Sequence, residues 1–200
     1  AIIEHIEKGA HGEIPETPKD ENIFKNVHNI IVASNSIACL AAYKKASELG
    51  YTPLFLSSMI EGDTGEAACF HGAIAHEIIK TGNPVQKPAC IISGGETTVV
   101  VKGSGLGGRN MEFAMVMATL IENTSIVAAS VGTDGTDGPT DAAGAIADGY
   151  TLSKAERMGL DINGYLNNND SYHFFERLGD LIKTGPTNTN VMDIRIILVI

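Results

Sequence analysis

One arginine stands out in the sequence because it follows a run of glycines in an otherwise acidic region. Residues 103–108 read Gly-Ser-Gly-Leu-Gly-Gly, and Arg109 comes directly after them. Between residues 89 and 150 the only basic residues are Lys102 and Arg109, against seven acidic ones. A guanidinium beside backbone amides is suited to hold a carboxylate or a transferring phosphoryl group. The alternative is a surface ion pair between Arg109 and Glu112.

The glycine run lies between a β-rich stretch and a predicted helix, where free amides attract anions. We therefore expect it to form a cradle for a phosphate or a carboxylate. Gly103, Gly105 and Gly108 satisfy G-x-G-x-x-G, but the acidic residue that a dinucleotide site needs about 20 positions on is missing. A P-loop would need lysine and serine or threonine where Arg109 and Asn110 stand. The alternative is a flexible glycine turn without a ligand.

An acidic loop follows a predicted buried strand, at the strand end where open α/β sheets place ligands. Asp134, Asp137 and Asp141, with Glu96 if the strands are neighbours, supply oxygen ligands of the kind that Mg²⁺ prefers. Asp-Gly steps are also ordinary turn chemistry, and Asp141 could simply start a helix. The histidines are scattered and pair with no serine or cysteine in a nucleophile motif, so a hydrolytic triad is not expected.

The elements that must position these residues alternate between strand and helix, which predicts an α/β fold. The expected strands are 30–33, 54–56, 89–92, 97–101, 126–131 and 194–200. The expected helices are 2–9, 37–49, 64–80, 110–121, 152–158 and 171–178. The strands 89–92 and 97–101 are expected to form a hairpin, and the prolines at 84 and 88 mark a domain boundary.

Composition narrows the class of protein. Of 200 residues 44% are hydrophobic, and the formal net charge of -10 argues against nucleic acid or an anionic membrane as the main partner. No apolar run is long enough to cross a bilayer, so we expect a cytoplasmic protein. Three separated cysteines indicate neither a disulfide framework nor a zinc site. The chain begins with Ala1 inside a helix-like stretch, as expected for a piece of a longer protein.

Four motifs occur in order between residue 93 and the end of the chain. They read Ser93-Gly94-Gly95-Glu96-Thr97-Thr98, Gly107-Gly108-Arg109-Asn110 with Glu112-Phe113-Ala114, Gly132-Thr133-Asp134-Gly135-Thr136-Asp137-Gly138, and Thr184-Gly185-Pro186-Thr187-Asn188-Thr189-Asn190-Val191 with Asp193. Together they resemble the C-terminal MOFRL domain of the glycerate 2-kinases, which were often labelled hydroxypyruvate reductases. The resemblance implies a mixed-sheet α/β MOFRL domain over 89–200, preceded over 1–88 by the end of a Rossmann-like N-terminal domain.

The resemblance also implies an activity. The full enzyme is expected to transfer the γ-phosphoryl group of ATP to the 2-hydroxyl of D-glycerate, with Mg²⁺ assisting, in a cleft between its two domains. Arg109 would bind the glycerate carboxylate or the developing phosphoryl charge, and Glu96, Asp134 and Asp137 are the candidate metal ligands. The other residues expected to bind substrate or nucleotide are Ser93, Gly94, Gly95, Gly107, Gly108, Asn110, Thr133, Thr136, Asn188 and Asn190.

The family's chains are longer than this one. The N-terminal half of their first domain, with a lysine expected in the active site, has no counterpart here, so this half of the enzyme is an expected partner and the fragment alone is expected to be inactive. Two alternatives remain open. One is an NAD(P)H-dependent hydroxypyruvate reductase, favoured by G-x-G-x-x-G and disfavoured by the missing ribose-binding acid. The other is a non-catalytic ligand-binding fragment.

Overall fold

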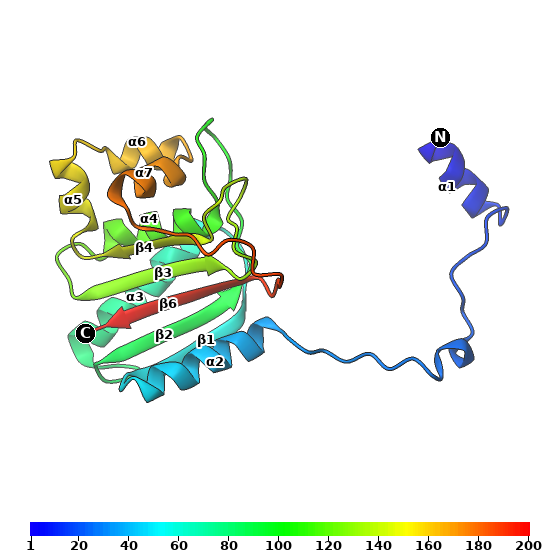
Figure 1. Cartoon of the computed structure of the whole chain (residues 1–200), viewed down its shortest axis with the longest axis horizontal. Coiled ribbons are helices and arrows are strands. Elements are labelled where there is room, and N and C mark those ends of the chain that lie inside the picture. The colour runs from blue at the N-terminus through cyan, green and yellow to red at the C-terminus, as the bar shows by residue number, and fades with distance from the viewer. The chain divides into compact units, whose positions relative to one another are not determined.

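The protein is built around one six-stranded sheet. The computed structural model describes residues 1–200. The strand order is β1-β2-β6-β3-β4-β5, with β1 parallel to β2 and every other pair antiparallel. Their bounds are β1 Thr52–Ile60, β2 Ala89–Gly95, β3 Ile126–Gly132, β4 Gly144–Asp148, β5 Leu181–Ile182 and β6 Asp193–Val199. The C-terminal strand β6 therefore lies between β2 and β3 (Figure 1). The α/β class with a mixed sheet is confirmed.

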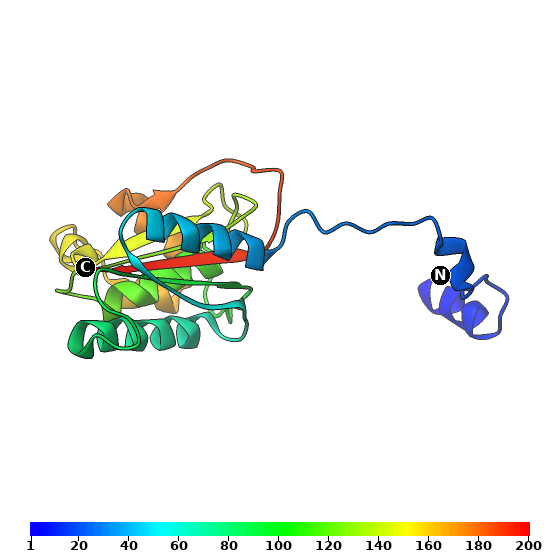
Figure 2. The ribbon, with the colours of Figure 1, turned by 90° about the horizontal axis from the view of Figure 1, so that it is seen from below.

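Helices cover both faces of the sheet. The helix α2 (Asn35–Glu48) packs on one face, and α3 (Thr64–Thr81) and α4 (Arg109–Leu120) pack on the other, as Figure 2 shows for α2 and α3. Along β2 the side chains alternate between the two sides, as the two-residue period of a strand requires. The short helices α5 (Thr151–Arg157), α6 (Ile162–Asn167) and α7 (Ser171–Leu178) complete the face that α4 covers.

Local signals located most of the helices correctly. Ser34 caps α2 by accepting a hydrogen bond from the Ile37 amide, and Asp63 caps α3 in the same way at Glu66. Gly82 ends α3 in the left-handed conformation that glycine adopts readily. The helix α4 is buried on most sides, as its apolar composition predicts. The short elements β4, β5 and α6 were not predicted, because they carry too few residues for a periodic pattern.

Residues 1–32 form a separate unit. It contains α1 (Ile2–Ala10) and one 3-10 turn, η1 (Glu21–Phe24), neither with a buried residue. The strand predicted for 30–33 is not formed, and Ile30 is 80% exposed. An apolar run becomes a strand only where a neighbour accepts its hydrogen bonds, and no strand of this structure pairs with it.

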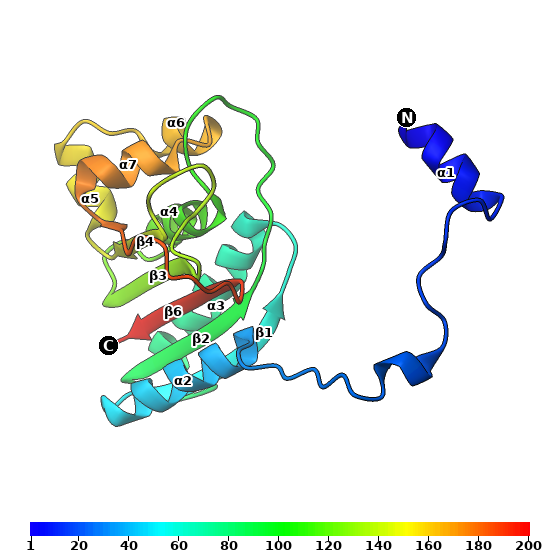
Figure 3. The same ribbon diagram turned by 45° about the vertical axis from the view of Figure 1, so that its right-hand side comes forward.

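The hairpin predicted for residues 89–101 is also wrong. Both edges of β2 are taken, by β1 and β6, so the segment from Thr97 onward has no place beside it. That segment makes one isolated bridge, between Thr98 and Asp63, and then runs as irregular chain past the N-terminal end of α4 towards α6 and α7 (Figure 3). The local turn signal predicted that residues 97–101 pair with β2, but β1 and β6 form those hydrogen bonds instead.

The structure divides after Val32, and the domain boundary predicted at residue 88 stays a prediction. Residues 33–200 form one compact unit, because β1 adds to the sheet beside β2 and α2 packs over both. The two prolines that suggested a boundary lie in the connection from α3 to β2. None of the helices combines the length and the apolar character that a bilayer span requires.

Asn35 ties the start of α2 to the start of β6. Its side-chain amide donates to the carbonyls of Val191 and Asp193, at 2.7 and 2.8 Å, and its oxygen accepts from the thiol of Cys39. This close approach requires glycine at position 94, where an added Cβ would overlap the Asn35 side chain.

We expect Gly94→Ala to lower the free energy of unfolding of this chain by roughly 2 to 4 kcal/mol, because the new methyl group displaces Asn35 and the carbonyls of Val191 and Asp193 lose their donor. Equilibrium urea unfolding measures the change. The matched control is Gly9→Ala, at a helical position where a Cβ would meet nothing within 4 Å. Equal unfolding midpoints for the two variants would contradict the role given to Gly94.

Candidate functional site

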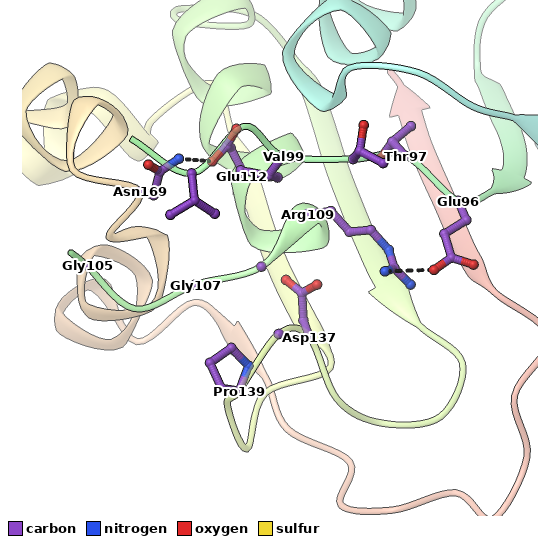
Figure 4. A pocket seen from close by; sticks show the side chains of 14 residues that line it. Glu96, Thr97, Val99, Gly105, Gly107, Arg109, Glu112, Asp137, Pro139 and Asn169 are labelled. Atoms are coloured by element: carbon purple, nitrogen blue, oxygen red, sulfur yellow. Dashed lines mark hydrogen bonds and ion pairs between the residues drawn. The ribbon is translucent and has the colours of Figure 1, made fainter. Parts of the chain in front are cut away.

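A cavity of about 740 Å³ opens at the carboxyl end of β2, beside the N-terminus of α4. Its size lies within the range of small-molecule sites. Arg109 is the only cationic residue on its wall, and Figure 4 shows the arginine side chain in the cavity. The residues that line the cavity are Glu96, Thr97, Thr98, Val99, Val101, Gly105, Gly107, Gly108, Arg109, Glu112, Asp137, Gly138, Pro139 and Asn169.

Asp193 holds the Arg109 guanidinium from below the cavity. Its carboxylate accepts from Nε at 2.6 Å and from Nη2 at 3.1 Å, a two-point geometry that fixes the plane of the guanidinium. A third donor, the side-chain amide of Asn110, reaches the same carboxylate at 3.0 Å. The hydrogen bonds that Arg109 donates to Asp193 raise the pKa of Arg109 above its usual value, so the arginine is a permanent cation.

Glu96 is the second partner of Arg109. Its carboxylate lies 3.0 Å from Nη1, and the pair is drawn in Figure 4. The pairing with Glu112 that the sequence left open is not formed, since the Glu112 carboxylate accepts from Asn169 at 3.2 Å. Burial raises the pKa of Glu112.

Asp137 occupies the amides at the N-terminus of α4. Its carboxylate accepts from the backbone amides of Asn110 and Met111, at 3.1 and 2.8 Å, and from the Asn110 side chain. The protein thus supplies its own anion where the sequence predicted a bound one. Burial raises the pKa of Asp137 to about 6, against the opposing effect of those hydrogen bonds. The expected anion cradle at this helix end is corrected accordingly.

The glycine run serves a packing role that sequence reasoning missed. The backbone amides of residues 102–106 already donate to the segment 168–170, which runs alongside them. A Cβ at Gly103 or Gly105 would overlap that segment, and one at Gly107 would overlap Ser171. The glycines therefore allow two chain segments to touch, and their amides up to Leu106 are not free for a phosphate.

A layer of buried polar side chains supports the cavity from beneath. Arg195, 1% exposed, donates to the hydroxyl of Thr97 at 3.0 Å and lies over the ring of Phe113. Beside it, Ser93 donates to Nε2 of His71 at 2.7 Å, because the other ring nitrogen must donate to the Ala67 carbonyl. Burial lowers the pKa of His71 to about 4, so this histidine is neutral near pH 7.

The predicted metal ligands do not come together. No group of three or more histidine, cysteine, aspartate or glutamate side chains is placed to hold a metal ion. Glu96 pairs with Arg109, Asp137 caps α4, and Asp134 accepts from the Thr136 amide and the Asn190 side chain. Asp141, the fourth candidate, pairs with Lys183. A site with three of these carboxylates is therefore not formed in this structure.

Residues 89–193 match the MOFRL family. The chain belongs to that family. It is 42% identical over 196 residues to the glycerate 2-kinase of Pyrococcus horikoshii and 41% identical over 199 residues to the D-glycerate 2-kinase of Thermotoga maritima. These alignments cover 98% and 99% of this chain but only 44% and 47% of those proteins. The MOFRL chain thus spans less than half the length of these two relatives.

The fold is shared with solved structures. The crystal structure of glycerate kinase from Thermotoga maritima superposes with a TM-score of 0.88 at 42% identity, covering 92% of this chain and 44% of that one. A Pyrococcus horikoshii protein gives a TM-score of 0.84, also at 42% identity, covering 98% of this chain and 44% of that one. Another relative, 41% identical over 187 residues, is a putative hydroxypyruvate reductase of Agrobacterium vitis.

The residues predicted for the site fall into three groups. Glu96, Gly107, Gly108, Arg109 and Asp137 line the cavity. Ser93, Gly94, Gly95 and Asn110 are buried and do not line it. The remaining residues, which lie in the loops 133–136 and 184–192 and do not line the cavity, are Thr133, Asp134, Thr136, Asn188 and Asn190.

The third group anchors the chain just before β6. The hydroxyl of Thr133 donates to the Met192 carbonyl and accepts from the Val191 amide. Asn190 reaches Asp134 at 3.3 Å, and the Thr187 amide donates to the Asp134 carbonyl. These contacts hold the chain leading into Asp193, so the loop residues bear on Arg109 through that carboxylate.

Sequence reasoning missed two charged residues that carry the site. Asp193 and Arg195 stand at alternating, inward-facing positions of an otherwise apolar strand. Alternating charged and apolar residues ordinarily predict a strand with one solvent-facing side, so the pattern signalled two charges but not that they are buried and paired. Asn169, which binds the glycine run and Glu112, left no such signal, because only the fold brings it to them.

We expect the Asp137 carboxyl to titrate near pH 6, which carboxyl ¹³C NMR can follow. Its pKa is higher in the folded chain than the ordinary 3.8, so its contribution to stability is full below about pH 4 and is lost as the pH rises to about 6. The loss is about 3 kcal/mol at 1.36 kcal/mol per pKa unit.

The variant Asp137→Asn lacks this titration. The difference in unfolding free energy between the two proteins should therefore change between pH 4 and 6, and other carboxyl groups cancel in the comparison. A carboxyl signal that titrates at or below pH 4 would contradict the burial argument.

Proposed function

We propose that this chain is the C-terminal portion of a glycerate kinase that transfers the γ-phosphoryl group of ATP to the 2-hydroxyl of D-glycerate, giving 2-phosphoglycerate. One observation carries the proposal: a single arginine, held by a buried carboxylate, faces a cavity of about 740 Å³ in a chain 41–42% identical to two glycerate 2-kinases over nearly its whole length. The conclusion is drawn for the whole protein, of which this chain forms one part.

Arg109 is the residue proposed to act on the reacting groups. Its side chain is 33% exposed, and the side turned away from Asp193 faces the cavity, where Glu96 lies 3.0 Å from Nη1. A guanidinium fixed before the ligand arrives stabilises negative charge without reorganising, which is the main catalytic need of phosphoryl transfer. Arg109 would bind either the glycerate carboxylate or the phosphoryl oxygens.

The nucleotide is proposed to be ATP, which supplies the phosphoryl group when bound. The carboxylates of this chain do not fit a shared Mg²⁺ site, as described above, and no step is assigned to the ion. Mg²⁺ in such enzymes commonly uses only one or two carboxylates together with phosphate oxygens and water. The chain's own contribution is therefore the arginine and the shaped wall around it.

The rest of the polypeptide is the proposed partner. Val99, Val101 and Pro139 give the cavity an apolar portion next to its charged one, which suits a ligand with both characters. Because the chain spans under half of its two glycerate 2-kinase relatives, the missing portion would supply the remaining groups, including a lysine. The isolated chain is expected to be inactive.

The reductase alternative has the name of the Agrobacterium vitis relative on its side, but the geometry of the glycine run and of the α4 N-terminus disfavours it. A dinucleotide would need free amides at the glycine run and at the α4 N-terminus, and these donate to residues 168–170 and to Asp137. In the full-length protein, ³¹P NMR of the product formed from ATP, Mg²⁺ and D-glycerate should show 2-phosphoglycerate. Formation of 3-phosphoglycerate would refute the regiochemistry, and NADH consumption with hydroxypyruvate in place of kinase activity would refute the proposal.

In the full-length enzyme, Arg109→Ala should lower kcat/KM for D-glycerate by roughly 30- to 1000-fold, equivalent to about 2 to 4 kcal/mol of transition-state stabilisation. Steady-state kinetics measure the loss. The matched control is Arg157→Ala, an exposed arginine of α5 that does not line the cavity, and it should change kcat/KM by less than about twofold. An unchanged kcat/KM in Arg109→Ala would remove this residue from the mechanism.

A further inference from the structure

The two carboxylates that meet Arg109 differ in their surroundings. The Asp193 side chain is 0% exposed, lies under the cavity and receives two aligned hydrogen bonds from the guanidinium. The Glu96 side chain is 52% exposed, lines the cavity and meets Nη1 as an ion pair at 3.0 Å without an aligned hydrogen bond. One partner belongs to the core, and the other stands in the space that a ligand would enter.

We infer that Glu96 is an exchangeable counter-ion: it neutralises Arg109 in the empty site and is displaced by the anionic group of the ligand. This inference rests on the proposed function and deepens it, since it assigns the Nη1 side of Arg109 to a carboxylate or phosphoryl oxygen. Asp193 stays in place and positions the guanidinium throughout.

The ion pair of Arg109 with Glu96 costs less to break than its pair with Asp193. An exposed ion pair contributes at most about 1 kcal/mol, so a ligand anion can replace it at small cost. Breaking a buried pair leaves an uncompensated charge and costs several times more. The Asn110 side chain adds a further bond to Asp193, whereas no other side-chain donor reaches the Glu96 carboxylate.

Displacement is also required by charge. The carboxylates on the cavity wall are Glu96, Glu112 and Asp137, against one arginine. Asp193 is shared between Arg109 and Arg195, which lies 3.6 Å from it, so Glu96 is the carboxylate that neutralises the cavity-facing side of Arg109. Glu96 is a long side chain on the irregular segment after β2, so rotation about its side-chain bonds can free Nη1 without moving the sheet.

The test is anion binding by the full-length protein, measured by titration calorimetry with D-glycerate and separately with inorganic phosphate. Glu96→Gln should tighten binding of at least one of them by about two- to fivefold, because the competing charge is gone. The anion whose affinity changes identifies the group that Arg109 receives. Unchanged or weaker binding of both anions would overturn the inference.

Two comparisons separate exchange from simpler effects. Glu112→Gln removes a carboxylate from the same cavity that bonds to Asn169 instead of Arg109, so it should tighten binding less than Glu96→Gln does. Equal tightening would mean a general charge effect and would overturn the inference. Asp193→Asn should weaken binding about tenfold or more, which is opposite in sign to the effect of Glu96→Gln. If both variants shift affinity in the same direction, the inference is also overturned.

The Arg109→Ala background separates this inference from the proposed function. There, Glu96→Gln should change affinity no more than Glu112→Gln does, since the pair no longer exists and only the general charge effect remains. If Arg109→Ala leaves anion binding intact, the role proposed for Arg109 fails. If Arg109→Ala abolishes binding but Glu96→Gln does not tighten it, only the exchange fails and the kinase proposal stands.

Discussion

The buried carboxylate of Asp193 is the constraint on which the rest of the site depends. A charge with no exposed surface must be compensated by fixed donors, and here Arg109 and Asn110 supply them from the first turn of α4. The start of β6 and the N-terminus of α4 are thereby locked together. Arg109 gains a defined direction from the same contacts, so one interaction both joins two elements of the fold and orients the arginine that we propose to bind the ligand.

The glycines near the site allow close packing of the backbone and do not form an anion-binding loop. A cradle of free amides needs glycine for backbone exposure, whereas Gly103 and Gly105 are needed because another segment of chain lies against them. The anion position at the α4 N-terminus is filled by Asp137. Attraction for a ligand anion therefore comes from one side chain and not from the backbone, which makes the counter-ions of Arg109 decisive.

The site also draws on segments that are distant from it in the sequence. Asn35, at the start of α2, bonds to the backbone at Val191 and Asp193, and the loop around Thr133 bonds to Met192. These contacts leave the stretch before β6 little freedom. Residues that the family resemblance marked as site residues, such as Asp134 and Asn190, lie outside the cavity wall and contribute through this support.

The sequence by itself determined the α/β class and the helices with capping signals, and it singled out Arg109 as a candidate, because caps, apolar periodicity and an isolated cation are local properties. Only the tertiary structure decided which carboxylate Arg109 binds, where the segment after β2 runs and why the glycines are needed. Those outcomes depend on contacts between residues 60 to 100 positions apart, such as Arg109 with Asp193, and competition among distant partners leaves no mark on neighbouring residues. The charges of Asp193 and Arg195 lie between these cases: their alternation along the strand was visible in the sequence, but their burial and their partners were not.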